Sequence, residues 1–244
     1  MTNTTIPKTM PEPMRLGKRL REQVVDGPQS LGARARARRW EVFRNSFPEV
    51  ESWSILDLGG TAEAWRRAPV QPKRVVVLNL VEPGTSHDPS VIPVAGDACE
   101  ARSVLTAAGV DPTFDVVFSN SLLEHVGGHA KRLDVSREVA ALAPYHWIQT
   151  PNRHFPVEPH WLFPGMQFLP FRVRTKVAEK WPLAHTPASS IDDARETVLW
   201  TELIGVSELH AYFPDSEIFK ERMAGLTKSI TAVKAPVPLR TASR

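Results

Sequence analysis

Polar residues stand where four apolar segments of the sequence end, and they are candidates for ligand binding. The segments cover residues 54–58, 74–80, 91–95 and 114–120, and the polar residues at their ends are Asp57, Asn79, Asp97 and Asn120. Carboxyl and amide groups bind small molecules through hydrogen bonds. If the segments are parallel strands, these groups meet at the edge of the sheet where open α/β folds bind their ligands.

A glycine turn follows the first apolar segment. Gly59-Gly60 lets the backbone pass closely beneath a ligand, because glycine has no side chain to obstruct the approach. The turn alone is weak evidence, since many strand-to-helix turns need a residue at positive φ and bind nothing. It gains weight from the polar residues that follow it along the chain.

A second group of residues could move protons. His125 follows Glu124 after the fourth apolar segment, and the proline-rich stretch 150–161 contains His154, Glu158 and His160. A reaction at a hydroxyl group needs a base that takes the proton, and histidine suits this role at neutral pH, with a neighbouring carboxylate to raise its basicity. The alternative is that Glu158 and His160 tie the stretch to the sheet by hydrogen bonds.

Strands and helices alternate strictly between residues 52 and 152, which predicts a doubly wound parallel sheet. The helix after the fourth apolar segment is expected to begin at about Ser121 and to resume from Leu133 to Leu142. Before it, we expect an amino-terminal arm and two helical patterns between Leu16 and Phe47, together forming residues 1–50. The remaining 51–244 would form one domain. Within it, a cap at about 153–200 precedes a strand and turn at 211–218 and a last strand at 229–234.

These features together resemble the class I S-adenosylmethionine-dependent methyltransferases, and among them small actinobacterial O-methyltransferases. The resemblance covers about residues 52–152 and rests on four motifs in order. It implies a Rossmann-like sheet of seven strands, mostly parallel, with an antiparallel last strand beside the fifth. It also implies S-adenosylmethionine as the cofactor.

The resemblance assigns cofactor contacts residue by residue. The methionine part would lie on Asp57, Leu58, Gly59 and Gly60, with Thr61 Oγ as a further contact. The ribose would lie at Asn79 and Leu80, and the adenine at Gly96, Asp97 and Ala98. Asp115, Ser119 and Asn120 would border the methyl-transfer site.

The sequence departs from the family pattern in two of the motifs. Asn79 stands where the family has an acid that binds both ribose hydroxyls, and Thr61 and Glu63 stand where glycines are common. A dinucleotide-binding dehydrogenase is the rival, but it would need a third glycine where Ala64 stands and an acid at Asn79. The methyltransferase interpretation is preferred because Gly96-Asp97 and the stretch 119–125 have no counterpart in the dehydrogenase pattern.

A metal site is not assigned. Glu124-His125 matches the end of the E-x-x-E-H magnesium motif of some O-methyltransferases, but Ser121 stands in place of its first acid. The loop spacing of His154, Glu158 and His160 is not a standard zinc spacing. Magnesium stays open as an activator.

The expected activity is O-methylation of a small-molecule hydroxyl. A saccharide is the leading acceptor, such as a precursor of a methylated mannose or glucose polysaccharide, and a phenolic, polyketide or lipid acceptor is the alternative. From a different class, the chain could be a non-catalytic or RNA-directed protein that binds through the arginine-rich helix at 31–47. Nucleic acid is the less favoured partner, because no RNA-binding signature accompanies the arginines. The preferred interpretation is an amphipathic helix that covers one edge of the sheet and leaves its arginines in solvent, namely Arg34, Arg36, Arg38, Arg39 and Arg44.

Composition sets outer bounds on these alternatives. The chain has 244 residues, a net charge of +3 and one cysteine, Cys99, so an internal disulfide is excluded. The amino-terminal residues lack the apolar core of a signal peptide, and no apolar run is long enough to span a bilayer. We therefore expect a cytoplasmic protein without a membrane partner, and a homodimer stays open.

Overall fold

The structure is a computed structural model that describes Gly27, residues 30–81 and residues 83–239. The predicted amino-terminal arm and the first of the two helical patterns lie outside the described residues. The chain divides into two compact units. The sheet unit comprises Arg39–Phe155 and the described residues from Thr201 to Leu239. The insertion unit comprises Pro156–Trp200 and the described residues up to Arg38.

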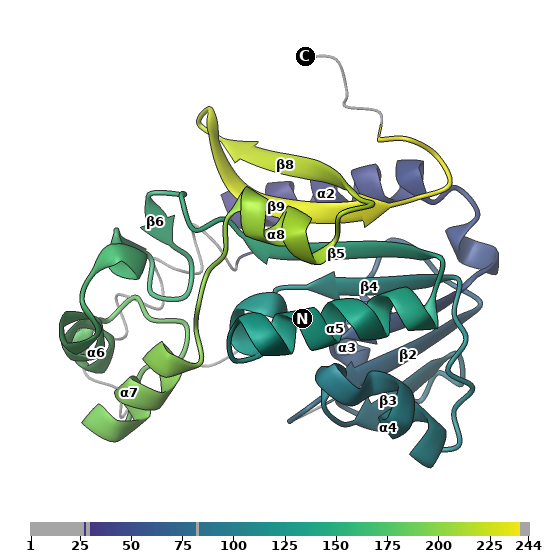
Figure 1. The fold of residues 1–244 in the computed structure, drawn as a ribbon, viewed down its shortest axis with the longest axis horizontal. Helices are drawn as coiled ribbons and strands as arrows, with labels where there is room; N and C mark the ends of the chain where they lie inside the picture. The colour runs from purple at the N-terminus through teal and green to yellow at the C-terminus, as the bar shows by residue number, and fades with distance from the viewer. Residues whose placement is uncertain (1–26, 28–29, 82, 240–244) are drawn as a thin grey trace. The chain divides into compact units, whose positions relative to one another are not determined.

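Seven strands form the central sheet of the sheet unit (Figure 1). Their order is β3-β2-β1-β4-β5-β9-β8, so the order reverses beside β1, at the switch point where doubly wound sheets bind ligands. The first five strands pair in parallel, whereas β9 runs antiparallel between β5 and β8. The strands are β1 (Ser54–Leu58), β2 (Arg74–Asn79), β3 (Val91–Ala95), β4 (Val116–Asn120), β5 (Tyr145–Pro151), β8 (Glu217–Met223) and β9 (Leu226–Lys234).

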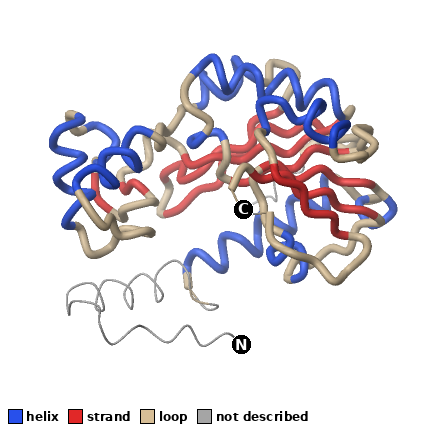
Figure 2. The backbone as a smooth tube through the Cα atoms, turned by 90° about the horizontal axis from the view of Figure 1, so that it is seen from below, coloured by secondary structure: helices blue, strands red, loops and turns tan. Residues whose placement is uncertain are grey.

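The predicted fold class is confirmed by this topology. The central strands read as near-continuous apolar runs, because helices cover the sheet on both faces (Figure 2). Helices α4 (Ala101–Ala107), α5 (His129–Leu142) and α8 (Val206–Tyr212) lie on one face, and α2 (Leu31–Ser46) and α3 (Ala62–Arg66) lie on the other. Short 3-10 turns lie at η2 (Val50–Ser52), η3 (Ala98–Glu100) and η4 (Leu123–His125).

Helix α2 packs on the sheet through the aromatic residues that the sequence places on one side. Trp40 stacks on Phe118 with 5.3 Å between ring centroids, and Phe43 meets Trp147 edge to face at 5.5 Å. Arg39 departs from the predicted solvent-exposed set, because its side chain bonds Glu221 and Gln149 on the sheet. Other arginines of the helix are exposed, namely Arg34, Arg36, Arg38 and Arg44.

Two predicted segments differ from the structure. The predicted helix start at Ser121 is wrong, because Ser121 takes a left-handed φ of 61° and is followed by the turn η4. The predicted continuation from Leu133 to Leu142 is confirmed by α5, which begins at His129. The predicted strand and turn at 211–218 is also wrong at its start, because α8 continues to Tyr212 and β8 begins at Glu217.

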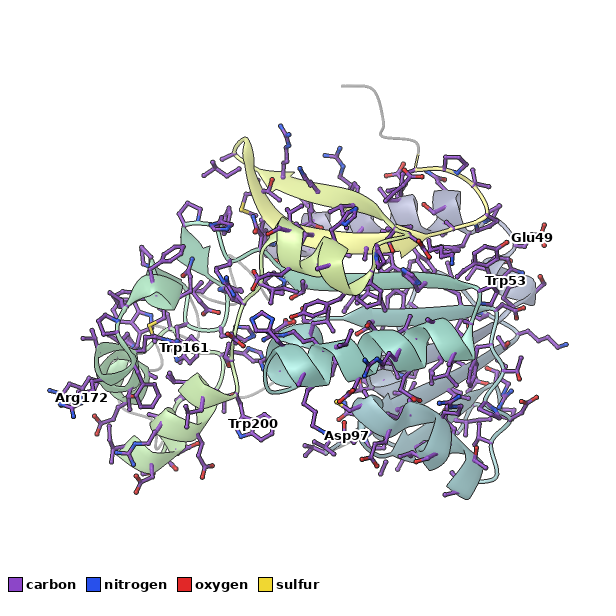
Figure 3. The ribbon with its side chains drawn as sticks, viewed as in Figure 1. Glu49, Trp53, Asp97, Trp161, Arg172 and Trp200 are labelled. Carbon is purple, nitrogen blue, oxygen red and sulfur yellow. The ribbon has the colours of Figure 1, made fainter. Side chains whose placement is uncertain are left out.

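The insertion unit has its own small core. It contains the hairpin β6 (Val157–Glu158) and β7 (Phe163–Pro164), the turn η5 (Met166–Phe168), and the adjacent helices α6 (Phe171–Lys180) and α7 (Ile191–Leu199). Trp161 is 2% exposed and packs with Met166, Ala178 and Ala194 (Figure 3). Trp161 is therefore a core residue of this unit.

Candidate functional site

The glycine turn after β1 has two positions that only glycine fits. Gly59 has a φ of +83°, and its N–H donates to the Leu78 carbonyl at 2.8 Å. A Cβ on Gly60 would lie 1.7 Å from Asp57 Oδ2, which is far inside van der Waals contact. The turn ends at Thr61, whose hydroxyl accepts the Ala64 N–H at 3.3 Å and caps α3. Thr61 Oγ is thus used by the helix start.

Asp57 supports the turn from below. Its side chain is 3% exposed, and Oδ2 accepts a hydrogen bond from the Trp65 indole at 2.7 Å. Burial raises the pKa of the Asp57 carboxyl to about 7, and the Trp65 hydrogen bond lowers it only in part. The carboxyl group therefore lies inside the fold, where it fixes the position of Gly60.

Asn79 holds the same turn from the neighbouring strand. Its amide nitrogen donates to the carbonyls of Gly59 and Gly60 at 3.1 and 2.8 Å, and its Oδ1 accepts the Val81 N–H at 3.1 Å. An ionised acid at this position could not donate either bond. This geometry explains why an amide replaces the family acid. Leu80, the next residue, is 61% exposed.

The segment after β3 lies beside the end of β2. The Gly96 N–H donates to the Asn79 carbonyl at 3.0 Å, and a Cβ on Gly96 would lie 2.3 Å from Val104 Cγ1. Asp97 is half-buried and accepts the Cys99 N–H at 2.8 Å through Oδ1, which caps η3 (Figure 3). Ala98 is buried at the start of η3. Asp97 is thereby held in one place at the edge of the sheet.

The end of β4 completes this edge. Ser119 is 1% exposed, and its hydroxyl donates to the Leu58 carbonyl at 2.9 Å, which ties β4 to β1. Asn120 Oδ1 is buried and has no hydrogen-bond partner among the described residues. Asp115 lies at the opposite end of β4, where it accepts bonds from Ser54 N and Oγ. Its predicted place beside the methyl-transfer site is therefore wrong.

A buried polar network follows β4, and sequence reasoning missed most of it. Glu124 is 1% exposed, and its Oε2 accepts the Thr150 hydroxyl at 2.9 Å. Arg132 is fully buried and donates to the Leu123 carbonyl and to the Glu202 carboxylate, each at 2.9 Å. Arg132 sits within a charged helical pattern typical of a surface, so the sequence carried no signal for its burial. His125 is half-buried on the same turn as Glu124.

The other predicted histidine of the sheet unit lies where the chain leaves β5. His154 is exposed, and its N–H donates to Asn152 Oδ1 at 3.3 Å. Arg153 beside it donates to the Leu203 carbonyl at 2.7 Å and to Glu208 at 3.0 Å. These bonds fix the base of the predicted loop.

The insertion unit pairs the remaining two candidates. His160 Nδ1 lies 2.6 Å from Glu158 Oε1, and Glu158 Oε2 accepts the Trp161 N–H at 3.0 Å. Glu158 is 2% exposed, so this carboxyl is held firmly. With Glu158 accepting from Nδ1, the lone pair of the His160 ring is on Nε2. The pairing fits a base oriented by an acid, and it equally fits a structural tie within the hairpin.

The structure thus brings the cofactor candidates together along one edge of the sheet unit. The parallel registers place Leu58 beside Leu78, Asn79 beside Ala95, and Asp57 beside Phe118. The residues that follow these positions are the glycine turn, Asn79 and Leu80, the 96–98 segment, and Ser119 with Asn120. Two of the predicted contacts, Asp57 and Asn79, also build the turn itself.

No family model and no curated protein matches the chain. Solved structures do match it. A putative methyltransferase from Thermobifida fusca YX is 15% identical, with 91% of this chain and 87% of that chain covered and a TM-score of 0.52. A complex of DhpI with SAM and HEP is 13% identical, covering 92% and 99%, with a TM-score of 0.50. These likenesses show the Rossmann-like fold of methyltransferases.

A third match differs in length. Human N-acetylserotonin methyltransferase in complex with SAM is 12% identical, with a TM-score of 0.46. The match covers 91% of this chain but only 56% of that protein.

Within the described part of the chain, no helix combines the length and hydropathy needed to cross a membrane.

Replacing Asn79 by aspartate should destabilise the protein, although the family pattern has an acid there. The variant loses two hydrogen bonds to turn carbonyls and places a negative group beside them, at a cost of about 2 kcal/mol or more in the free energy of unfolding. Urea denaturation at pH 7.5 measures the loss, and Asn45→Asp on the exposed side of α2 is the matched control. Equal stability of Asn79→Asp and the wild type would refute the assigned role.

Asp57 should make the protein less stable as the pH rises. Its folded pKa of about 7 exceeds the ordinary value of 3.8, so its contribution is full below pH 4 and is lost as the pH rises through 7. Asp57→Asn removes this loss and should be more stable than the wild type at pH 8 by about 4 kcal/mol, but not at pH 4.

The pH dependence of stability must be compared between variants, because the ionisation of His146 makes the protein more stable as the pH rises, which is opposite to the effect of Asp57. Burial lowers the pKa of His146 to about 4, so its contribution is lost as the pH falls below 6.5. Denaturation curves of Asp57→Asn and of the exposed control Asp111→Asn, taken from pH 4 to 8, isolate the Asp57 effect. Parallel pH profiles of stability for Asp57→Asn and the wild type would show that the pKa of the Asp57 carboxyl is not raised in the folded protein.

Proposed function

We propose that the chain is an S-adenosylmethionine-dependent methyltransferase that binds its cofactor over the glycine turn of the sheet unit. The observation that carries the proposal is the position of this turn, at the carboxyl end of β1 and beside the switch point of a methyltransferase-type sheet. The DhpI complex, which has the same fold, contains SAM. The cofactor would supply an electrophilic methyl group, and the chain would bind and orient it.

The residues along the edge of the sheet fit this cofactor. Asn120 Oδ1 is a buried acceptor without a partner among the described residues, and the cofactor carries an ammonium group that can donate to it. Asp97 offers a carboxyl group to the adenine amino group. The Asn79 side chain lies at the position that the ribose would occupy, and its amide nitrogen is used by the turn. We therefore expect cofactor binding with a weaker hold on the ribose than an acid would give.

The proposed reaction is transfer of the methyl group to a hydroxyl of a small molecule. The hydroxyl proton must leave as the new C–O bond forms, and we assign the base to His160 because Glu158 holds its ring with Nε2 as the basic nitrogen. His125 and His154 are the alternatives. A saccharide is the proposed acceptor, with a phenolic, polyketide or lipid hydroxyl as the alternative. The cytoplasmic location and the homodimer expected from the sequence remain predictions.

An RNA-directed protein is the second class, and it receives less support. The predicted basic face of α2 is reduced by Arg39, which forms a salt bridge with Glu221 and is 16% exposed. Exposed arginines remain on the helix, so a salt titration of RNA binding is still informative. Steep weakening of binding with added salt would favour this class.

A screen for S-adenosylhomocysteine release over sugars, phenols and lipids tests the activity. With the best acceptor, His160→Ala should lower kcat by about 10² to 10⁴-fold, because a positioned base contributes that factor, and should leave cofactor affinity nearly unchanged. Glu158→Gln should lower kcat by a smaller factor than His160→Ala does. It should also move the acid limb of the pH dependence of kcat, because the histidine loses its carboxyl partner.

His210→Ala, an exposed histidine on α8, is the control and should keep normal kcat. If His160→Ala keeps normal kcat and loses only thermal stability, the hydrogen bond between Glu158 and His160 is structural and another residue is the base. No product with any acceptor, despite folded protein, would count against methyl transfer itself.

A further inference from the structure

Glu124 is a buried acid whose second oxygen has no hydrogen-bond partner within the part of the chain that the structure describes. The residue is 1% exposed, Oε2 accepts the Thr150 hydroxyl, and Oε1 has no hydrogen bond with any described residue. Such an orphaned polar atom costs about 1 to 3 kcal/mol, so it is rare unless a ligand or an ion supplies the missing partner. The proposed cofactor contacts do not use Glu124.

The surrounding residues hold Glu124 in a fixed place. The Glu124 carbonyl accepts the Glu202 N–H at 2.9 Å, and Arg132 donates to the carbonyl of the preceding Leu123. Arg132 Nη1 is itself buried and has no hydrogen-bond partner in the described part of the chain, so the two buried groups do not satisfy each other. The carboxyl group is therefore positioned by neighbours that leave one oxygen open, as a recognition group would be.

Glu124 lies at the same end of the sheet as the proposed cofactor site, because it follows the end of β4 and bonds Thr150 near the end of β5. It lies four residues after Asn120, which ends β4, and the left-handed Ser121 turns the chain between them. Leu122 in the same segment lies against the glycine turn, since its Cδ1 would be 3.0 Å from a Cβ on Gly59. One short segment thus contains Leu122, which lies beside the glycine turn, and the buried Glu124 two residues later.

We propose that Glu124 binds the methyl acceptor by accepting a hydrogen bond from one of its hydroxyl groups. This inference rests on the proposed function and deepens it. The acceptor is then a neutral molecule with a free hydroxyl at the position that meets Glu124, and a carboxylate or phosphate there is excluded by repulsion. Glu124 acts in binding, so the proton of the reacting hydroxyl goes elsewhere.

Probe pairs that differ only in their hydroxyls test the proposal. Catechol against its dimethyl ether, and methyl α-mannoside against its permethylated form, are titrated into protein saturated with S-adenosylhomocysteine and followed by saturation-transfer NMR. In at least one pair, the hydroxylated member should bind at least ten-fold more tightly. Benzoate should not bind.

Glu124→Gln is the informative variant, because the glutamine keeps the size and the Thr150 bond but turns the open oxygen into a donor. It should abolish the preference for the hydroxylated probe and leave S-adenosylhomocysteine affinity unchanged. With an acceptor that turns over, its KM should rise about ten-fold with kcat changed less than three-fold. Glu217→Gln, exposed on β8, should behave as the wild type.

Several outcomes would overturn the proposal. The first is that both members of every probe pair bind equally or do not bind. The second is that the preference for the hydroxylated probe survives in Glu124→Gln. The third is a 100-fold loss of kcat at constant KM in Glu124→Gln, which would make Glu124 the base. Failure of S-adenosylhomocysteine to bind the wild type would count against the proposed function instead. The probe pairs are then titrated into the protein without S-adenosylhomocysteine. A preference of the wild type for the hydroxylated probe, and its loss in Glu124→Gln, would still support the binding role of Glu124.

Discussion

The contact between the Asp57 carboxyl and the Gly60 backbone is the constraint on which the site depends. No side chain larger than hydrogen fits at Gly60, because Asp57 Oδ2 occupies that space. Asp57 is held there by Trp65 on α3, and the turn carbonyls are held by Asn79 on β2. Three consecutive elements, β1, α3 and β2, therefore meet in one set of hydrogen bonds. The raised pKa of Asp57 is the energetic consequence of burying that carboxyl.

Most of the fold could be predicted from the sequence, because parallel strands covered on both faces leave a clear pattern. The apolar runs at 54–58 and 74–79, and the glycines after the first of them, mark the strands and the turn without reference to distant residues. The sequence failed where a few backbone angles decide the outcome. Ser121 takes a left-handed conformation that its residue type does not announce, and this delays α5 by several residues.

The site was harder to predict than the fold, because the same residue type can face a ligand or a neighbouring loop. Asn79 stands at a position that the resemblance assigns to the ribose, yet its amide nitrogen bonds the turn. Arg132 lies in a charged helical pattern and is nevertheless fully buried. These roles depend on the three-dimensional partners of each side chain. Spacing along the chain places a residue on an element but does not say what it touches.

Hydrogen–deuterium exchange with and without S-adenosylhomocysteine tests the central claim most directly, because it locates a bound cofactor without any substitution. The account predicts slowed amide exchange on binding in the segments 57–61, 79–81, 96–98 and 119–122, which end four adjacent strands. It predicts no slowing in β8, at the far edge of the sheet. Binding that leaves the glycine turn unprotected, or protection confined to other segments, would contradict the account.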